Sequence, residues 1–95
     1  MSKKVCKIIY ADGKTEDLEV HKLSLEKAQK IIGGDKEATV ARIDMNDGIC
    51  MLCDEDGDMK NLEVNEYAEE ILSGNRRQFS IIVGTVIIVP KGCGW

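Results

Sequence analysis

The residues with the most obvious chemical potential lie in one segment, "GICMLCDEDGD", which spans residues 48–58. Cys50 and Cys53 have the C-x-x-C spacing that occurs in zinc sites and in thiol redox sites. The segment reads as a strand, where side chains alternate between faces, so a spacing of three sends the two sulfurs to opposite sides of a sheet. Only a break in the strand would bring them together. We therefore interpret both cysteines as small apolar residues packed in a strand, and expect no metal site.

The carboxylates that follow argue against thiol chemistry and against a calcium loop. They are Asp54, Glu55, Asp56 and Asp58. Their negative charge opposes the thiolate that a redox cysteine needs. Counted from Asp54, an EF-hand loop requires glycine at position six and glutamate at position twelve, whereas Gly57 is fourth and Asn65 is twelfth. The acidic run is best interpreted as a solvated β-turn.

The rest of the chain offers no credible catalytic set. His21 is the only histidine, so catalysis through a histidine base would depend on it, and its charged neighbours indicate a surface position. Arg76 and Arg77 could clamp a phosphate, although a charged loop is the more common interpretation of such a pair. Cys6 and Cys93 lie far from the C-x-x-C pair in the sequence. We expect no enzymatic activity and no cofactor.

Apolar periodicity predicts the elements that must position these residues. Two β-rich segments around Asp12-Gly13 indicate a hairpin. Three further strands, "KEATVARIDM", "ICMLCD" and "MKNLEV", are expected as a meander, because Asp-Gly pairs separate them. The apolar run "FSIIVGTVIIVP" predicts a strand buried on both faces in the middle of a sheet. With a helix after each group, the order is ββα-βββα-β: an α+β fold whose mostly antiparallel sheet is covered by two short helices.

Both helices have recognisable boundaries and apolar stripes. The first is expected to begin after the N-cap Ser24 and to end at Gly33-Gly34. Its predicted apolar stripe consists of Leu25, Ala28, Ile31 and Ile32. The second helix is expected to start at the cap Asn65 and to close near Gly74. Its inner face is predicted to carry the i,i+4 pairs Tyr67–Ile71 and Ala68–Leu72.

Length and charge set limits on the class of protein. The 95 residues make one domain, residues 1–95, and we expect residues 91–95 to be a loose tail. No apolar run reaches the ~20 residues that span a bilayer, and no signal peptide is evident. Four cysteines without a secretory signal indicate free thiols in a reducing cytosol. Residues 44–70 contain ten acidic residues and one lysine, which is the reverse of a nucleic-acid-binding surface.

The order of motifs resembles a family of small domains of unknown function. The similarity runs from about Val5 to Val89 and rests on Gly33-Gly34, "MLCDEDG", Asn65 and Gly84-Thr85. Members of that family occur in phages and integrative or conjugative elements, mostly of Gram-positive bacteria. They commonly have a cysteine followed by an acidic turn, as at Cys53, which implies a structural role for this residue. The resemblance implies a phage or mobile-element origin and the cytoplasm of a bacterial host, and it transfers no catalytic residue.

These observations lead to a hypothesis of a non-enzymatic accessory protein that binds a host or element protein with a basic surface. The expected partner-binding residues are the acidic residues and the terminal tryptophan: Asp54, Asp56, Asp58, Glu66, Glu69, Glu70 and Trp95. The alternative hypothesis is a protein that binds or sequesters a nucleotide signal through Arg76 and Arg77. Neither a membrane nor direct nucleic-acid contact is expected, and the sequence leaves the oligomeric state open.

Overall fold

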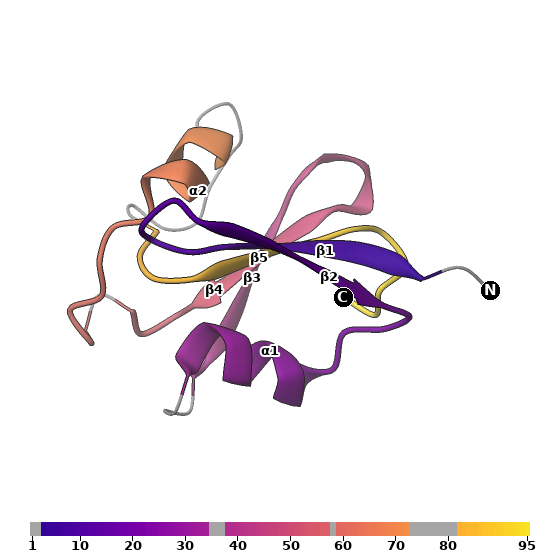
Figure 1. Cartoon of the computed structure of the whole chain (residues 1–95), viewed down its shortest axis with the longest axis horizontal. Coiled ribbons are helices and arrows are strands. Elements are labelled where there is room, and N and C mark those ends of the chain that lie inside the picture. Colours follow the sequence, from indigo (N-terminus) through magenta and orange to yellow (C-terminus); the bar gives the residue numbers. More distant parts are fainter. Residues whose placement is uncertain (1–2, 35–37, 58, 73–81) are drawn as a thin grey trace.

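A five-stranded antiparallel sheet separates two helices in the computed structural model, which describes residues 3–34, 38–57, 59–72 and 82–95 (Figure 1). The elements of these residues are β1 (Lys4–Ile9), β2 (Thr15–Val20), α1 (Leu25–Gly33), β3 (Val40–Asp44), a short 3-10 turn (Asn46–Gly48), β4 (Cys50–Asp54), α2 (Glu66–Leu72) and β5 (Val86–Val89). The strands lie in the order β2-β1-β5-β4-β3. The α+β class with its antiparallel sheet and two helices agrees with the prediction.

β5 occupies the centre of the sheet, as its apolar sequence predicts. It pairs with β1 on one side, where Ile88 faces Lys7, and with β4 on the other, where Ile87 faces Leu52. β5 begins at Val86, after Gly84 bends the chain with a φ of 75°; residues 79–81 of the apolar run lie outside the described residues. Before that bend, Val83 makes only an isolated bridge to Val64.

The third strand of the predicted meander does not form, so the predicted order ββα-βββα-β is wrong at this point and the observed order is ββα-ββα-β. Residues 59–62 make turns instead, in which Lys60 and Leu62 donate backbone hydrogen bonds to the carbonyl of Gly57. The reason lies in the sheet: β3 and β5 already occupy both edges of β4. No edge of β4 remains for "MKNLEV" to pair with.

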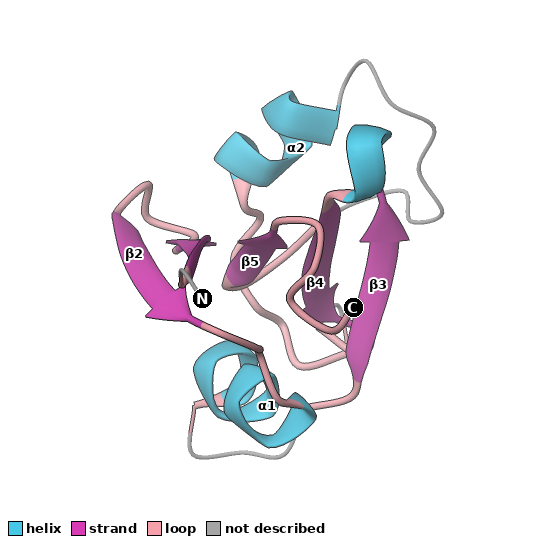
Figure 2. Cartoon of the chain, turned by 90° about the vertical axis from the view of Figure 1, so that its right-hand side faces the viewer, coloured by secondary structure: helices cyan, strands magenta, loops and turns pink. Residues whose placement is uncertain are grey.

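Each face of the sheet carries its own apolar core. The core on the α1 side contains Cys6, Ile8, Leu23, Ala28, Ile32, Ala38, Cys50, Leu52, Ile87, Val89 and Cys93. The core on the α2 side contains Ile9, Ile43, Met51, Cys53, Ala68, Leu72, Ile82 and Val86. Figure 2 shows the two helices on opposite sides of the sheet. Cys50 and Cys53 fall in different cores, which confirms that the odd spacing separates their sulfurs.

α1 follows its predicted boundaries, and three of the four residues of its predicted stripe, Ala28, Ile31 and Ile32, pack on the core. The Ser24 hydroxyl accepts a hydrogen bond from the Lys27 amide at 3.2 Å, and Gly34 ends the helix with a φ of 63°. Ala28 and Ile32 are buried. Leu25 was expected beside them but is 54% exposed, so the predicted stripe is wrong at the first turn of the helix.

Residues 91–95, predicted to be a loose tail, pack against the α1 side of the sheet. The Leu23 amide donates to the Cys93 carbonyl at 3.0 Å, and the Trp95 indole Nε1 donates to the Leu23 carbonyl at 2.8 Å. Cys93 is fully buried and Trp95 packs on the same core. Within the described part of the chain, no helix is long and apolar enough to cross a membrane.

Candidate functional site

Asn65 fixes the start of α2 against the sheet. Its side-chain amide Nδ2 donates hydrogen bonds to the carbonyls of Ile9, at 3.0 Å, and Gly84, at 2.9 Å. Its Oδ1 accepts the amide of Ala68 at 3.0 Å, which makes it the N-cap that the sequence predicts. The side chain is fully buried and all its polar atoms have partners. One residue therefore joins β1, the segment before β5 and α2.

This anchor determines which face of α2 points inward. Ala68 and Leu72 are in phase with Asn65 along the helix and are buried. Glu69, expected to face a partner, instead accepts a hydrogen bond from the Ile82 amide at 2.9 Å through its carboxylate. The Glu69 carboxylate therefore helps to hold the segment around Ile82, just before β5, against α2.

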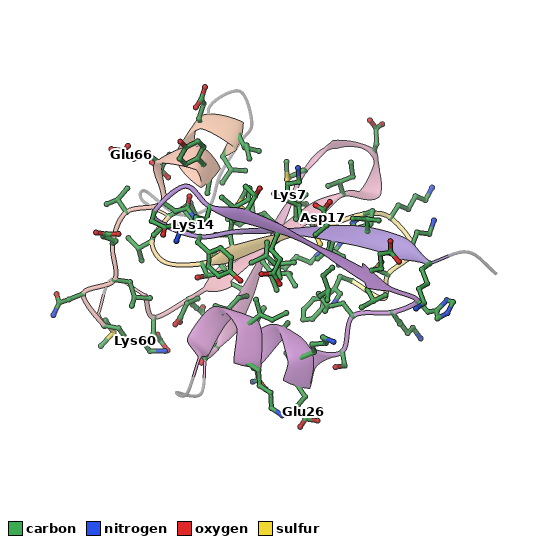
Figure 3. All side chains as sticks on the ribbon, in the orientation of Figure 1. Lys7, Lys14, Asp17, Glu26, Lys60 and Glu66 are labelled. Carbon is green, nitrogen blue, oxygen red and sulfur yellow. The ribbon has the colours of Figure 1, made fainter. Side chains whose placement is uncertain are left out.

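The outward face of α2 combines apolar and acidic side chains. Tyr67 and Ile71, predicted on the inner face, are 51% and 38% exposed, so that part of the prediction is wrong. Glu66 and Glu70 are exposed in the neighbouring row, and Figure 3 shows Glu66 directed away from the sheet. Together with the exposed Val64 just before the helix, these four residues form what we call the α2 surface.

The ring of Tyr67 also touches the first hairpin. A Cβ atom built on Gly13 would lie 2.6 Å from the ring carbon Cε2 of Tyr67, so the ring lies directly on the turn between β1 and β2. Gly13 has a φ of 96°, a conformation that glycine adopts without strain. The α2 surface is therefore held at its N-terminal end by Asn65 and beside the hairpin by this aromatic contact.

The acidic turn after β4 is less exposed than its sequence indicates. The carboxylate of Asp54 is buried and forms an ion pair with the Lys60 ammonium at 2.7 Å. Its second oxygen accepts the amide of Asp56 at 2.9 Å, so Asp54 organises the turn rather than facing solvent. Glu55 and Asp56 are exposed. Asp58, another predicted contact residue, lies outside the described residues.

Trp95, which the sequence predicts as a contact residue, does not join this site. Trp95 lies on the α1 side of the sheet, where it is partly buried, and α2 lies on the opposite side. Arg76 and Arg77, which the alternative hypothesis assigns to a nucleotide, fall outside the described residues. Among the described residues of the predicted set, Glu66 and Glu70 are the two that lie exposed on α2.

The four cysteines are free and buried, and their surroundings disfavour the thiolate. Burial, with Asp54 and Glu55 as smaller contributions, raises the pKa of Cys53 to about 11. Burial also raises the pKa of Cys50. Across residues 3–34, 38–57, 59–72 and 82–95, no group of three or more histidine, cysteine or acidic side chains is placed to hold a metal ion.

Sequence reasoning missed the apolar part of the α2 surface, although a signal was present. Asn65, Ala68 and Leu72 have the i, i+3, i+7 spacing of one helical face. A helix as short as α2 can turn only one narrow stripe toward a sheet. If Asn65 is counted as part of the buried stripe, Tyr67 and Ile71 fall outside that stripe.

The fold and the site together define a small α+β domain, in which an antiparallel sheet is enclosed by one helix on each face and one helix exposes acidic and apolar side chains. A family model described as a domain of unknown function, DUF3846, matches residues 6–94. The chain therefore belongs to this family. No curated protein and no solved structure matches the chain.

Proposed function

We propose that this domain is a non-enzymatic protein-binding module and that its α2 surface binds a partner with a basic, partly apolar face. The observation that carries the proposal is the pairing of Tyr67 and Ile71 with Glu66 and Glu70 on one exposed helix face. Protein interfaces commonly combine an aromatic anchor near the centre with a charged rim. Because Asn65 fixes the helix, binding here would not require the helix to be ordered first.

The charge of this region supports a basic partner. Glu55 and Asp56 are exposed in the turn after β4, and Glu63 is exposed just before α2. An excess of acidic side chains accelerates encounter with a basic protein, and the acceleration weakens as salt is added. The same charge repels the phosphates of nucleic acids, so the proposal includes no direct nucleic-acid contact.

The biological setting is also part of the proposal. The likeness of the chain to domains of phages and integrative or conjugative elements supports an accessory role inside a bacterial host. The partner would then be a cytoplasmic protein of the host or of the element itself. Membership of DUF3846 is compatible with this role and assigns no activity.

Affinity capture with matched charge variants tests the proposal. The bait proteins are the wild type, Glu66→Lys with Glu70→Lys, Tyr67→Ala, and a control with Glu19→Lys and Glu26→Lys. The control has the same net charge as the first double variant, and its two exposed glutamates lie on β2 and α1. Figure 3 shows Glu26 on the opposite side of the sheet from α2. We expect one bacterial protein to bind the wild type and the control and to be lost from both α2 variants. Equal capture by all four baits would contradict the proposal.

A nucleotide signal as ligand of Arg76 and Arg77 is the alternative, and a thermal-shift panel of nucleotides distinguishes it. A ligand at ~100 times its Kd stabilises a protein by ~2.7 kcal/mol, which is easily measured as a higher Tm. The protein-binding proposal predicts no shift across the panel. A shift that disappears in Arg76→Ala with Arg77→Ala would favour the alternative.

A further inference from the structure

Three of the four thiols gather on the α1 side of the sheet, opposite the α2 surface. Cys6 is in β1, Cys50 is in β4 and Cys93 is in the C-terminal segment, and all three belong to the same buried core. Each is at most 1% exposed. Free cysteine is often buried as a small apolar residue, so this location alone assigns the three thiols no role.

The sheet register excludes one pair of these thiols, Cys6 and Cys50. Cys50 is opposite Val89 of β5, and Lys7 is opposite Ile88, so Cys6 is next to Val89 on the other side of that strand. Cys6 and Cys50 are therefore separated by a whole strand, or about 10 Å at the usual strand spacing. A disulfide requires Cα atoms within about 7 Å, which excludes this pair.

Cys93 approaches Cys6 instead. After Val89 the chain turns at Gly92, which has a φ of 91°, and returns over the α1 side. There Cys93 packs in the same buried core as Cys6. Burial, together with the neighbouring Cys93 thiol, raises the pKa of Cys6 to about 12. Burial is the larger cause. Cys6 therefore stays protonated at neutral pH and reacts slowly while the C-terminal segment is closed.

We propose that Cys6 and Cys93 are an oxidation site, at which a hydroperoxide forms a disulfide that locks the C-terminal segment to β1. Two hydrogen bonds to Leu23 hold that segment, one from the Leu23 amide to the Cys93 carbonyl and one from the Trp95 indole to the Leu23 carbonyl. Local opening of these bonds exposes Cys93 and leaves the sheet intact. The site is thus gated by the last residues of the chain.

The chemistry balances with hydrogen peroxide as oxidant. The Cys93 thiolate attacks one peroxide oxygen, the O–O bond breaks, and the products are a sulfenic acid and, after proton transfer, water. When the segment closes, the Cys6 sulfur attacks the Cys93 sulfur, the S–O bond breaks and a second water leaves. Two thiols are oxidised to one disulfide while the peroxide is reduced to two waters.

Peptide mapping after treatment of the folded wild-type protein with hydrogen peroxide tests this inference. We expect a Cys6–Cys93 linked peptide, the loss of two hydrogen masses, and a Tm raised by about 5 °C or more, because the bond closes nearly the whole chain. Reductant should reverse both changes. A linkage that involves Cys50 or Cys53, a disulfide between two molecules, or no disulfide at all would overturn the proposal.

A second variant tests the gate and does not depend on removing a core cysteine. Trp95→Ala removes the indole contact with Leu23, so disulfide formation should accelerate about tenfold as the segment opens more often. Alkylation of Cys53, which lies in the other core, serves as the control and should keep its rate. Equal acceleration of the alkylation of Cys53 would indicate general loosening of the fold. An unchanged rate of disulfide formation would show that the C-terminal residues do not control access to the thiols. Either result contradicts the proposal.

Discussion

Single side chains decide much of this structure, and Asn65 is the clearest case. Its amide group supplies two donors and one acceptor to three different segments at a site with no access to water. A buried polar group that loses its partner is more costly than the average hydrogen bond is favourable. The position therefore requires a side chain with both a donor and an acceptor in this geometry.

Replacement of Asn65 by alanine should lower the free energy of unfolding by about 3 kcal/mol or more, since it leaves two carbonyls and one amide unpaired and removes a helix cap. Chemical denaturation of the variant measures this loss. Asn61→Gly is the matched control, because Asn61 is exposed and has a φ of 57°, which glycine tolerates. A change in the control as large as that in Asn65→Ala would contradict the special role of Asn65.

The buried thiol of Cys53 should lower the free energy of unfolding as the pH becomes alkaline. Its pKa is raised from an ordinary value of 9.0 to about 11, so the folded state favours the protonated thiol. This contribution is fully present below pH 9 and is lost as the pH rises through about 11, where the thiolate forms. We expect the difference in unfolding free energy between wild type and Cys53→Ala to shrink by up to about 2–3 kcal/mol between pH 8 and pH 11. If the difference in unfolding free energy between the two proteins stays constant from pH 8 to pH 11, the result contradicts the buried environment of this thiol.

At the scale of elements, the sequence predicts well what local patterns control. The first hairpin follows from Asp12-Gly13, and α1 follows from its Ser24 cap and its terminal glycines. The central place of β5 follows from its unbroken apolar character. Each of these features depends on residues close together in the sequence.

What the sequence could not predict depends on competition between distant segments. The segment "MKNLEV" has the pattern of a strand, but β4 is already paired on both edges, and β5 comes from far along the chain to take one of them. The burial of Asp54 is a local feature that residue types also do not predict, since it depends on Lys60 reaching back across the turn. Neither the pairing of β4 on both edges nor the burial of Asp54 can be deduced from the local sequence pattern alone.

The orientation of α2 gives a prediction at this scale. Leu72→Ala should lower the free energy of unfolding by about 2–5 kcal/mol, because it leaves a cavity in the core on the α2 side. Tyr67→Ala should lower it by less than about 1 kcal/mol, because that ring is half exposed and its removal leaves no buried cavity. Urea denaturation of the two variants measures both values. The reverse order would show that α2 turns its other face to the sheet.

At the scale of the whole molecule, the sheet divides the chain into two sides with different chemistry. The α1 side holds three thiols and the C-terminal segment, whereas the α2 side holds Cys53 and the exposed acidic helix. Because β4 runs between both cores, its two cysteines contribute to opposite sides. The C-x-x-C motif is thus split by the fold.

This division leads to an expected result for zinc. Purified protein should contain well under one zinc per chain by elemental analysis, and EDTA should leave the Tm unchanged, because Cys50 and Cys53 cannot share one ion. Cys53→Ala serves as a comparison and should show the same zinc content as the wild type. One zinc per chain that falls to zero in this variant would mean that the strand opens to form a site.

The association rate of the captured partner, measured at low and high ionic strength, tests the central claim most directly. Reversal of the charges at Glu66 and Glu70 should slow association about tenfold or more at low salt and flatten its salt dependence, while the fold is retained. The control that reverses Glu19 and Glu26 should associate nearly as the wild type does. If the association rate and its salt dependence are the same for wild type and the α2 variant, the α2 surface is only a solvated face of the domain.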